Sequence, residues 1–156
     1  MKLNFDNEAA LTAAAAKLAQ RWRDKGVTTL CVGLRGPLGS GKTTWVRATL
    51  EGLGYAGRVP SPTYTLLEEY RVSSLTLVHL DLYRFSDPEE LEFLGVRERF
   101  GASDVWLFVE WPERAPSLLK KCDVVLDFAP VGPTGRVVTF SAQSATGRAA
   151  LAWERL

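Results

Sequence analysis

One segment, Gly36-Pro37-Leu38-Gly39-Ser40-Gly41-Lys42-Thr43, limits the fold of this chain more than any other part of the sequence. It fits the phosphate-loop pattern, in which a glycine, four further residues and a second glycine precede a lysine and a serine or threonine. Residues 28–34 before it predict a buried strand, and Val46, Leu50 and Leu53 after it repeat at helical spacing. A strand, a glycine-rich loop and a helix in this order are typical of phosphate binding in an α/β protein.

The residue types of this loop suit the chemistry of phosphate binding. Glycines let backbone N–H groups turn inward around phosphate oxygens, and the helix that follows directs its positive end at the same anion. Lys42 adds a positive charge for the outer phosphates, and the Thr43 hydroxyl is a ligand that Mg²⁺ accepts. The alternative is an ordinary glycine-rich turn with a solvated lysine, which the flanking strand and helix make the weaker interpretation.

A magnesium site beside a phosphate loop needs an acidic residue, normally at the end of a buried strand. Asp81 ends the apolar residues 77–80 and Glu110 ends residues 105–109, so each carboxylate is expected where α/β sheets bind ligands. A helix cap or a surface ion pair would explain either residue equally well. The pattern alone therefore leaves both as candidates.

The remaining sequence predicts helices and strands in alternation. The expected helices cover residues 1–26, 88–94, 112–119 and 148–156, and the further expected strands cover residues 64–71, 75–80, 105–110, 123–128 and 136–140. Within residues 1–26, Asp6 or Asn7 can cap the helix and Gly26 can end it. Strands that alternate with helices give an α/β class, and the hairpins make the sheet mixed. We therefore expect a single P-loop NTPase-like domain over residues 1–156, with a mixed β-sheet flanked by helices and with antiparallel hairpins.

Charge and hydropathy exclude several classes of function. Lys plus Arg number 19 and Asp plus Glu number 18, so no bulk positive field attracts RNA, and any RNA contact is local or made by a partner. The longest apolar runs, such as residues 105–109, are far shorter than the roughly 20 residues of a membrane-spanning helix. Because the N-terminus also lacks the pattern of a secretory signal, we expect a cytoplasmic protein without membrane contact.

The cysteines and the single histidine favour structural roles. Cys31 and Cys122 lie far apart in apolar segments, without metal-ligand or redox spacing, so we expect buried free thiols. A catalytic triad would have His79 as its base, but no nucleophile elbow accompanies it. Packing or a supporting role beside the site suits this histidine better.

Four blocks of the sequence together resemble the TsaE family, also called YjeE. They are residues 38–44, 61–66, 81–93 and 110–112, which contain Leu-Gly-Ser-Gly-Lys-Thr-Thr, Ser-Pro-Thr-Tyr-Thr-Leu, Asp-Leu-Tyr-Arg leading into Asp-Pro-Glu-Glu-Leu-Glu-Phe, and Glu-Trp-Pro. The phosphate loop alone occurs in many unrelated enzymes, whereas its combination with the other three blocks is highly specific.

The resemblance implies a small ATPase of bacterial tRNA threonylcarbamoyladenosine biosynthesis, with ATP and Mg²⁺ as its ligands. It implies that the protein joins TsaB and TsaD while TsaD transfers threonylcarbamoyl onto the adenosine beside the anticodon. Contact with tRNA would then be indirect, through the complex. In this role the chain supplies nucleotide-driven turnover and not the transfer chemistry.

The resemblance also implies roles for individual residues. Thr43 and Glu110 look like Mg²⁺ ligands, and Asp81 looks like a second acidic group at the metal or its water. Thr63 looks like a switch threonine near the γ-phosphate. The expected catalytic residues are Lys42, Thr63, Asp81 and Glu110.

The nucleotide is expected to contact the loop and two further positions. The expected nucleotide-binding residues are Leu38, Gly39, Ser40, Gly41, Lys42, Thr43, Thr44, Glu8 and Arg136. For Glu8 and Arg136 the alternative is an exposed, solvated charge. The family usually has an acidic residue after the first loop glycine, where this chain has Pro37. Proline lacks a backbone donor, but binding should survive because the cradle begins further along, at Leu38.

Two other functions would share the same loop. A small-molecule kinase usually needs an arginine-rich lid, which Arg97 and Arg99 could imitate, and product analysis with candidate acceptors would separate it from an ATPase. A nucleotide-dependent binding module would use the loop without meaningful turnover. Phosphate release in the presence of partner proteins would decide that case.

Overall fold

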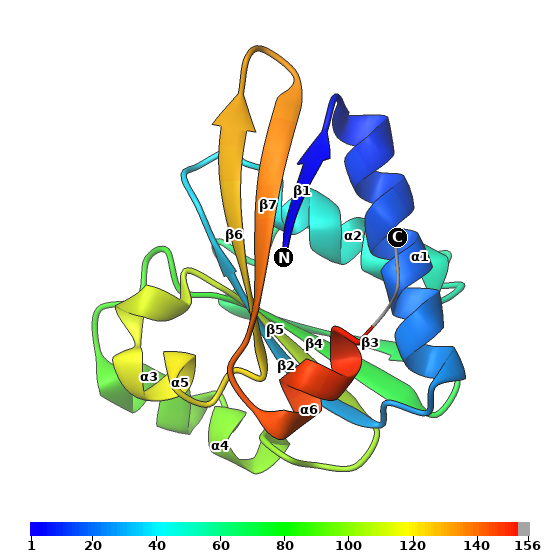
Figure 1. Cartoon of the computed structure of the whole chain (residues 1–156). Helices are drawn as coiled ribbons and strands as arrows, with labels where there is room; N and C mark the ends of the chain where they lie inside the picture. The colour runs from blue at the N-terminus through cyan, green and yellow to red at the C-terminus, as the bar shows by residue number, and fades with distance from the viewer. Residues whose placement is uncertain (153–156) are drawn as a thin grey trace.

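The computed structural model describes residues 1–152, without the side chains of Pro88 and Phe93. Within residues 1–152, seven strands form one sheet with helices on both faces (Figure 1). The strands are β1 (Lys2–Phe5), β2 (Thr29–Arg35), β3 (Leu67–Val72), β4 (Leu75–Asp81), β5 (Val105–Glu110), β6 (Val124–Val131) and β7 (Gly135–Ala142). The helices are α1 (Glu8–Asp24), α2 (Lys42–Gly52), α3 (Pro88–Phe93), α4 (Val96–Arg99), α5 (Pro116–Leu119) and α6 (Ala145–Ala150), with a 3₁₀ turn, η1 (Pro112–Arg114). None of these described helices has the length and apolarity needed to cross a membrane.

The sheet has a parallel centre and antiparallel edges. Its strand order is β1-β7-β6-β2-β5-β4-β3. Strand β2 pairs in parallel with β5 and β6, and β4 pairs in parallel with β5, whereas β1, β3 and β7 join antiparallel. The predicted α/β class and mixed sheet are therefore confirmed. Because parallel strands end at the same edge of a sheet, the residues that follow β2, β4 and β5 lie close together.

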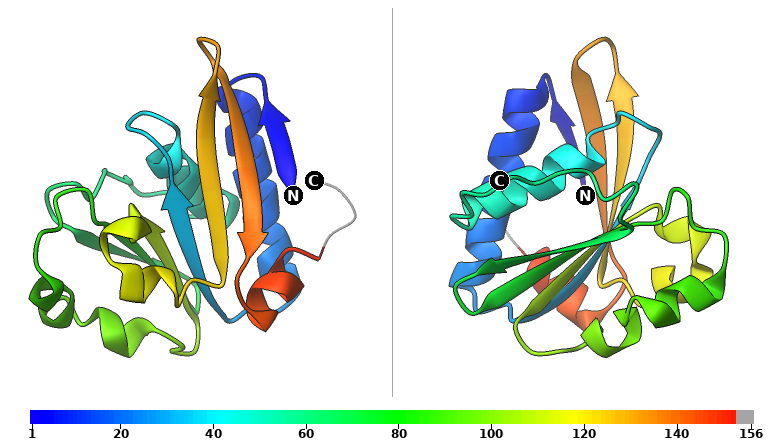
Figure 2. Two further views of the ribbon diagram at one scale, coloured as in Figure 1. Left: turned by 60° about the vertical axis from the view of Figure 1, so that its left-hand side comes forward. Right: turned by 180° about the vertical axis from the view of Figure 1, so that it is seen from behind.

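Helices cover both faces of this sheet (Figure 2). Helices α1 and α2 pack on one face, with α6 beside the end of α1, and α3, α4 and α5 lie on the other. Helices α1 and α2 also approach each other closely, because a Cβ atom added to Gly52 would lie 2.6 Å from the backbone of Ala16. Glycine at this position therefore lets α2 settle against α1.

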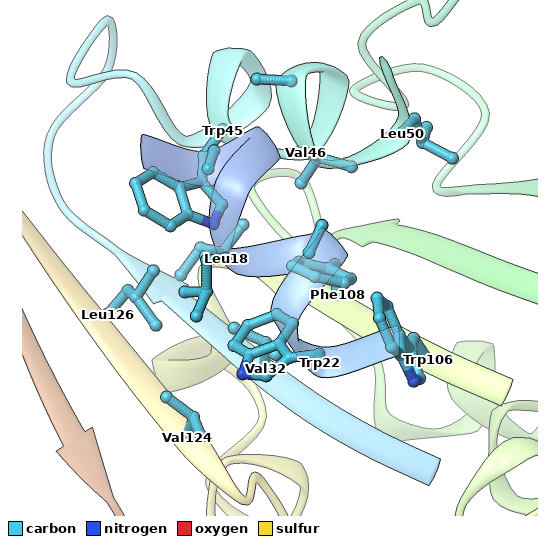
Figure 3. Packing of buried hydrophobic residues seen from close by; sticks show 14 of the residues in the cluster. Leu18, Trp22, Val32, Trp45, Val46, Leu50, Trp106, Phe108, Val124 and Leu126 are labelled. Carbon is cyan, nitrogen blue, oxygen red and sulfur yellow. The ribbon is translucent and has the colours of Figure 1, made fainter. Parts of the chain in front are cut away.

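Tryptophan side chains fill the core beneath α1 and α2 (Figure 3). Trp22 and Trp106 meet edge to face with ring centres 5.6 Å apart, and Trp22 donates its indole N–H to the carbonyl of Ala150 at 2.9 Å. Trp45 of α2 lies 5.9 Å from the Phe128 ring. Each such aromatic pair adds about 0.5–1.5 kcal/mol beyond the burial of its area, so the core holds α2 and the loop before it on the sheet.

The prediction for the N-terminus is partly wrong. The sequence predicts one helix over residues 1–26, but Lys2–Phe5 forms β1, which pairs with β7. Helix α1 begins at Glu8, and Asn7, one of the two predicted caps, accepts a hydrogen bond from the N–H of Ala10, so the predicted cap is confirmed. Strand β1 is held by pairing with residues far along the chain, which a local pattern does not reveal.

Other boundaries differ by a few residues. Strand β3 begins at Leu67 and not at residue 64, because a turn with Leu66 at a φ of +63° precedes it. Strand β6 runs to Val131, so its hairpin turn is tighter than expected. The expected helix over residues 112–119 is the 3₁₀ turn η1 followed by α5, and the sequence did not predict α4.

The closing helix expected over residues 148–156 starts earlier and is shorter. Helix α6 begins after Ser144, whose side chain accepts a hydrogen bond from the N–H of Gly147, and it ends at Ala150. Residues 153–156 of that prediction lie outside the described residues.

Cys31 and Cys122 are buried free thiols, as predicted. Cys31 lies in β2 and Cys122 comes just before β6, so the pairing of these strands brings the sulfur atoms to 3.6 Å. The hydrogen bond with Cys122, together with burial, raises the pKa of the Cys31 thiol well above its usual value. Cys31 therefore stays protonated, and both cysteines pack as part of the core on the face covered by α3, α4 and α5.

Candidate functional site

The glycine-rich loop connects β2 to α2 at the edge where the parallel strands end. Gly41, directly before α2, has a φ of +109°, which favours glycine, and no side chain caps the helix. In the described chain, the backbone N–H groups of residues 41–44 have no hydrogen-bond acceptor. Unpaired donors at the positive end of an 11-residue helix form a binding site for an anion such as phosphate.

The Lys42 side chain folds back over this loop. Its Nζ donates to the carbonyl oxygens of Gly36 at 2.7 Å and Pro37 at 2.9 Å. Lys42 is 4% exposed, and this burial lowers the pKa of its ammonium, partly offset by the negative charge of Glu110 and other carboxylates. Since none of the described carboxylates bonds directly to Lys42, its charge stays available for a ligand in front of the loop.

Thr43, in the first turn of α2, meets the end of β5. Its hydroxyl donates to Oε1 of Glu110 at 2.7 Å, and the same oxygen accepts a second hydrogen bond from Nε2 of His79 at 2.8 Å. Glu110 is 3% exposed and His79 is fully buried. A buried carboxylate is costly unless donors surround it, so these bonds stabilise Glu110 in its place.

Asp81 and Thr63 form the other acidic part of the site. Strands β4 and β5 pair with Asp81 opposite Glu110, so the carboxylates are neighbours at the sheet edge. Oδ2 of Asp81 accepts from the Thr63 hydroxyl at 3.0 Å, and Oδ1 accepts from the backbone N–H of Tyr83 at 2.8 Å. The bond to Thr63 brings the segment between α2 and β3 to the site.

These groups surround one pocket with a volume of about 180 Å³. It is lined by Leu38, Gly39, Gly41, Lys42, Thr43, Thr44, Ser61, Thr63, Asp81, Tyr83, Glu110 and Trp111. The pocket thus joins unpaired N–H donors, an ammonium and neighbouring carboxylates, which suits a phosphorylated ligand together with a cation.

Some expected site residues do not line this pocket. Ser40 is fully buried under the loop. Arg136 donates to the carbonyl oxygens of Ser40 at 3.0 Å and Gly39 at 3.2 Å, so it holds the loop from behind. Glu8 is exposed in the first turn of α1. A nucleotide contact by Arg136 or Glu8 stays a prediction.

Sequence reasoning assigned no role to Ser61 or Tyr83, which both line the pocket. The hydroxyl of Ser61 lies 2.8 Å from that of Thr63, and the ring centre of Tyr83 lies 5.2 Å from that of Trp111. Both residues belong to blocks that carry the family resemblance, so the sequence contained a signal for their neighbourhood but none for their contacts.

The residues present fit a nucleotide with Mg²⁺. The unpaired N–H groups of residues 41–44 match phosphate oxygens, and the hydroxyl of Thr43 and the carboxylates of Glu110 and Asp81 offer the oxygen ligands that Mg²⁺ prefers. Within residues 1–152, no group of three or more His, Cys, Asp or Glu side chains could hold a metal ion. A cation at this site would therefore also need phosphate oxygens or water, which is the usual way that Mg²⁺ binds.

The arginines that could imitate a kinase lid lie elsewhere. Arg97 forms an ion pair with Glu92 at 2.5 Å, and Arg99 forms one with Glu69. Neither arginine lines the pocket in front of the loop. The two arginines that could have formed the lid of a small-molecule kinase are therefore not part of this pocket.

Comparisons with known proteins agree on one family. The family described as threonylcarbamoyl adenosine biosynthesis protein TsaE matches residues 5–138. The tRNA threonylcarbamoyladenosine biosynthesis protein TsaE of Haemophilus influenzae is 46% identical over 98 residues, which are 63% of this chain and 61% of that protein. The protein of the same name in Bacillus subtilis is 39% identical over 132 residues, which are 84% of this chain and 79% of that protein.

A solved structure has the same fold. The crystal structure of YdiB from Bacillus subtilis matches with a TM-score of 0.74 and 27% identity, over 96% of this chain and 90% of that one. The chain spans less than two thirds of some relatives it matches, namely 61% of the Haemophilus influenzae protein and 55% of the Synechocystis protein.

Proposed function

The chain belongs to the TsaE family, and from this premise we propose that it is the Mg²⁺-dependent ATPase subunit of tRNA threonylcarbamoyladenosine biosynthesis. It acts with TsaB and TsaD on the adenosine next to the anticodon, and it drives turnover without performing the transfer. Two relatives, from Haemophilus influenzae and Bacillus subtilis, carry the name of this pathway. The observation that carries the proposal is the set of unpaired N–H groups at residues 41–44, which share one pocket with Lys42 and the carboxylates.

The loop binds the phosphates of ATP. Its backbone N–H groups and the positive end of α2 receive phosphate oxygens. Lys42, which donates to the carbonyls of Gly36 and Pro37, redirects a donor to the outer phosphates, because a hydrogen bond to an anion is stronger than one to a neutral carbonyl. Arg136 keeps the loop in shape through its bonds to the carbonyls of Gly39 and Ser40.

Thr43 and Glu110, which are hydrogen-bonded to each other, would hold Mg²⁺, and Asp81 lies opposite Glu110 at the sheet edge. When bound, Mg²⁺ supplies positive charge that offsets the negative charge on the phosphate oxygens during transfer. Thr63 links the segment before β3 to Asp81 at 3.0 Å, so it can exchange this bond for one to the γ-phosphate. Asp81 then orients water with the oxygen that Thr63 releases.

Hydrolysis is slow without partners because the pocket is short of positive charge. Lys42 is the only Lys or Arg among its described lining residues. Arg84 stacks on Tyr64, with its guanidinium carbon 4.5 Å from the ring centre, and does not line the pocket. Phosphoryl transfer commonly needs a further cation or a water-orienting group, which a partner supplies in this proposal.

Co-purification with TsaB and TsaD, with and without ATP, tests partner and nucleotide together. We expect the three proteins to associate, and we expect ATP to change the amount recovered. A folded chain that binds neither partner, with or without ATP, would contradict the proposed role.

The two alternative functions are tested separately. No observation on the site favours a kinase. Phosphate release measured with the partners distinguishes an ATPase from a nucleotide-dependent binding module.

A further inference from the structure

His79 is the single histidine of the chain and lies fully buried directly under the site. It is placed on β4 two residues before Asp81, so both side chains point to the same face of the sheet. On the neighbouring strand β5, Glu110 pairs with Asp81, which brings the Glu110 carboxylate within reach of the imidazole. The contact is a hydrogen bond of 2.8 Å between Nε2 and Oε1.

The hydrogen-bond pattern assigns the tautomer of the His79 ring. Its Nδ1 is buried and has no hydrogen-bond partner among the described residues. A proton on Nδ1 would therefore leave a buried donor unpaired, and it would turn the lone pair of Nε2 toward the carboxylate oxygen of Glu110. The proton belongs on Nε2, from which it is donated to Glu110.

The hydrogen bond from His79 engages only one of the two carboxylate oxygens of Glu110. Oε1 accepts from both Thr43 and His79, whereas Oε2 accepts from no described residue and Glu110 lines the pocket. Thr43 lines the pocket and is itself a proposed ligand of the cation. His79 is the fixed donor, since it is held inside the sheet between β3 and β5.

We propose that His79 is a positioning residue that orients Glu110 toward the Mg²⁺-nucleotide through its Nε2–H. The inference rests on the proposed function, because it concerns the carboxylate assigned there to Mg²⁺. Hydrogen bonds behind a ligating carboxylate fix its direction, and their loss typically lowers metal affinity or activity by about 10- to 100-fold. Without this donor the Glu110 carboxylate would turn toward other donors in the pocket.

The test measures how much Mg²⁺ tightens nucleotide binding. Calorimetric titration of ADP with excess Mg²⁺ and with a chelator gives two dissociation constants for each protein, and their ratio reports the metal contribution. For His79→Leu, which lacks a donor, we expect this ratio to fall by about tenfold while the affinity of metal-free ADP changes little. For His79→Gln, whose side-chain amide reaches the position of Nε2, we expect most of the ratio to return.

Two further variants separate positioning from packing. Val78→Ala removes buried volume from the adjacent residue of β4, on the opposite face, and should lower stability without changing the ratio. His79→Asn is polar but too short to reach Glu110, so it should behave like His79→Leu, and it provides the comparison with His79→Gln if the leucine variant does not fold.

The outcomes are distinct. An unchanged ratio in folded His79→Leu or His79→Asn, or equal ratios for the asparagine and glutamine variants, would overturn the positioning role while the proposed function stands. A wild-type protein that binds no nucleotide, or binds it equally with and without Mg²⁺, would overturn the proposed function and the inference with it.

Discussion

The ammonium nitrogen of Lys42 lies 4.3 Å from the centre of the Trp111 indole ring. Trp111 directly follows β5 with a φ of +57°, and its backbone N–H donates to the carbonyl of Leu34 at 3.1 Å, so the end of β2 holds the ring in place. A left-handed backbone at a residue other than glycine costs roughly 1 kcal/mol or more. The cation–π contact between the Trp111 ring and the Lys42 ammonium offsets this cost and keeps the lysine at the phosphate loop.

The first prediction concerns the charge on Lys42. Lys42→Ala should weaken ATP and ADP binding by roughly 10- to 100-fold, because a charge-assisted hydrogen bond contributes about 1.5–3 kcal/mol. Titration calorimetry measures the affinity. The control is Lys17→Ala, which removes the same charge from an exposed position on α1. Equal nucleotide affinity in wild type and in folded Lys42→Ala would show that the loop does not bind phosphate in this way.

The second prediction concerns the segment that Thr63 ties to Asp81. If Thr63 exchanges this bond for the γ-phosphate, hydrogen exchange across residues 60–75 should be slower with a non-hydrolysable ATP analogue than with ADP. Helix α6, of which no residue lines the pocket, serves as the internal control and should exchange equally in both states. Identical exchange across residues 60–75 in the two states would argue against a nucleotide-dependent switch.

Much of the fold could be predicted because its strongest patterns are local. The buried strand, the glycine loop and the apolar spacing of the helix after it gave β2 and α2, and the run of Pro88 and acidic residues after Asp87 gave α3. Strand β1 could not be predicted, since four residues form a strand only through their pairing with β7. The same holds for the end of β6, where the hairpin extends through Pro130 to Val131.

In the candidate site, too, the features with a local pattern could be predicted and those that depend on strand order could not. The phosphate loop and the carboxylates at the strand ends were recognisable, because each follows from residue type and from the end of a strand. The bonds of Glu110 to Thr43 and His79 depend on the order of β2, β5 and β4 in the sheet, which no local pattern contains. Arg136 could not be placed behind the loop without knowing that β7 lies beyond β6.

The third prediction concerns Tyr70, whose hydroxyl is buried without a partner among the described residues. Burial raises the pKa of Tyr70 from its usual 10.0 to about 12. Tyr70→Phe removes an unpaired polar atom and should raise the free energy of unfolding by about 1 kcal/mol at pH 7.

The pH dependence of this effect has a definite sign. Above pH 10 the phenol of the unfolded chain loses its proton before that of the folded protein, so wild type loses stability as the pH rises toward about 12. The advantage of Tyr70→Phe should therefore grow over this range in denaturant titrations. Tyr64→Phe, at a side chain that is 80% exposed, is the control and should show no advantage. A stability gap for Tyr70→Phe that stays constant between pH 9 and pH 11 would contradict the assignment.

The fourth prediction concerns the carboxylates of Asp81 and Glu110. Asp81→Asn and Glu110→Gln keep the size of each side chain, and in the complex with TsaB and TsaD each should lower ATP turnover by about 100-fold or more. Nucleotide affinity should fall by about tenfold at most, because metal and water placement matter most in the transition state. The control is Glu98→Gln, at an exposed carboxylate outside the pocket. Equal losses of affinity and turnover would assign these carboxylates to binding alone.

Phosphate release by the isolated protein, compared with release in the presence of TsaB and TsaD, tests the proposed function most directly. Lys42 alone offers positive charge among the described residues of the pocket, so we expect slow hydrolysis by the lone chain and a marked increase when both partners are added. The increase should require Mg²⁺ and should be absent in Glu110→Gln. The proposed function would be contradicted by vigorous hydrolysis by the lone protein that the partners leave unchanged. It would also be contradicted if no ATP were hydrolysed even in the complete mixture.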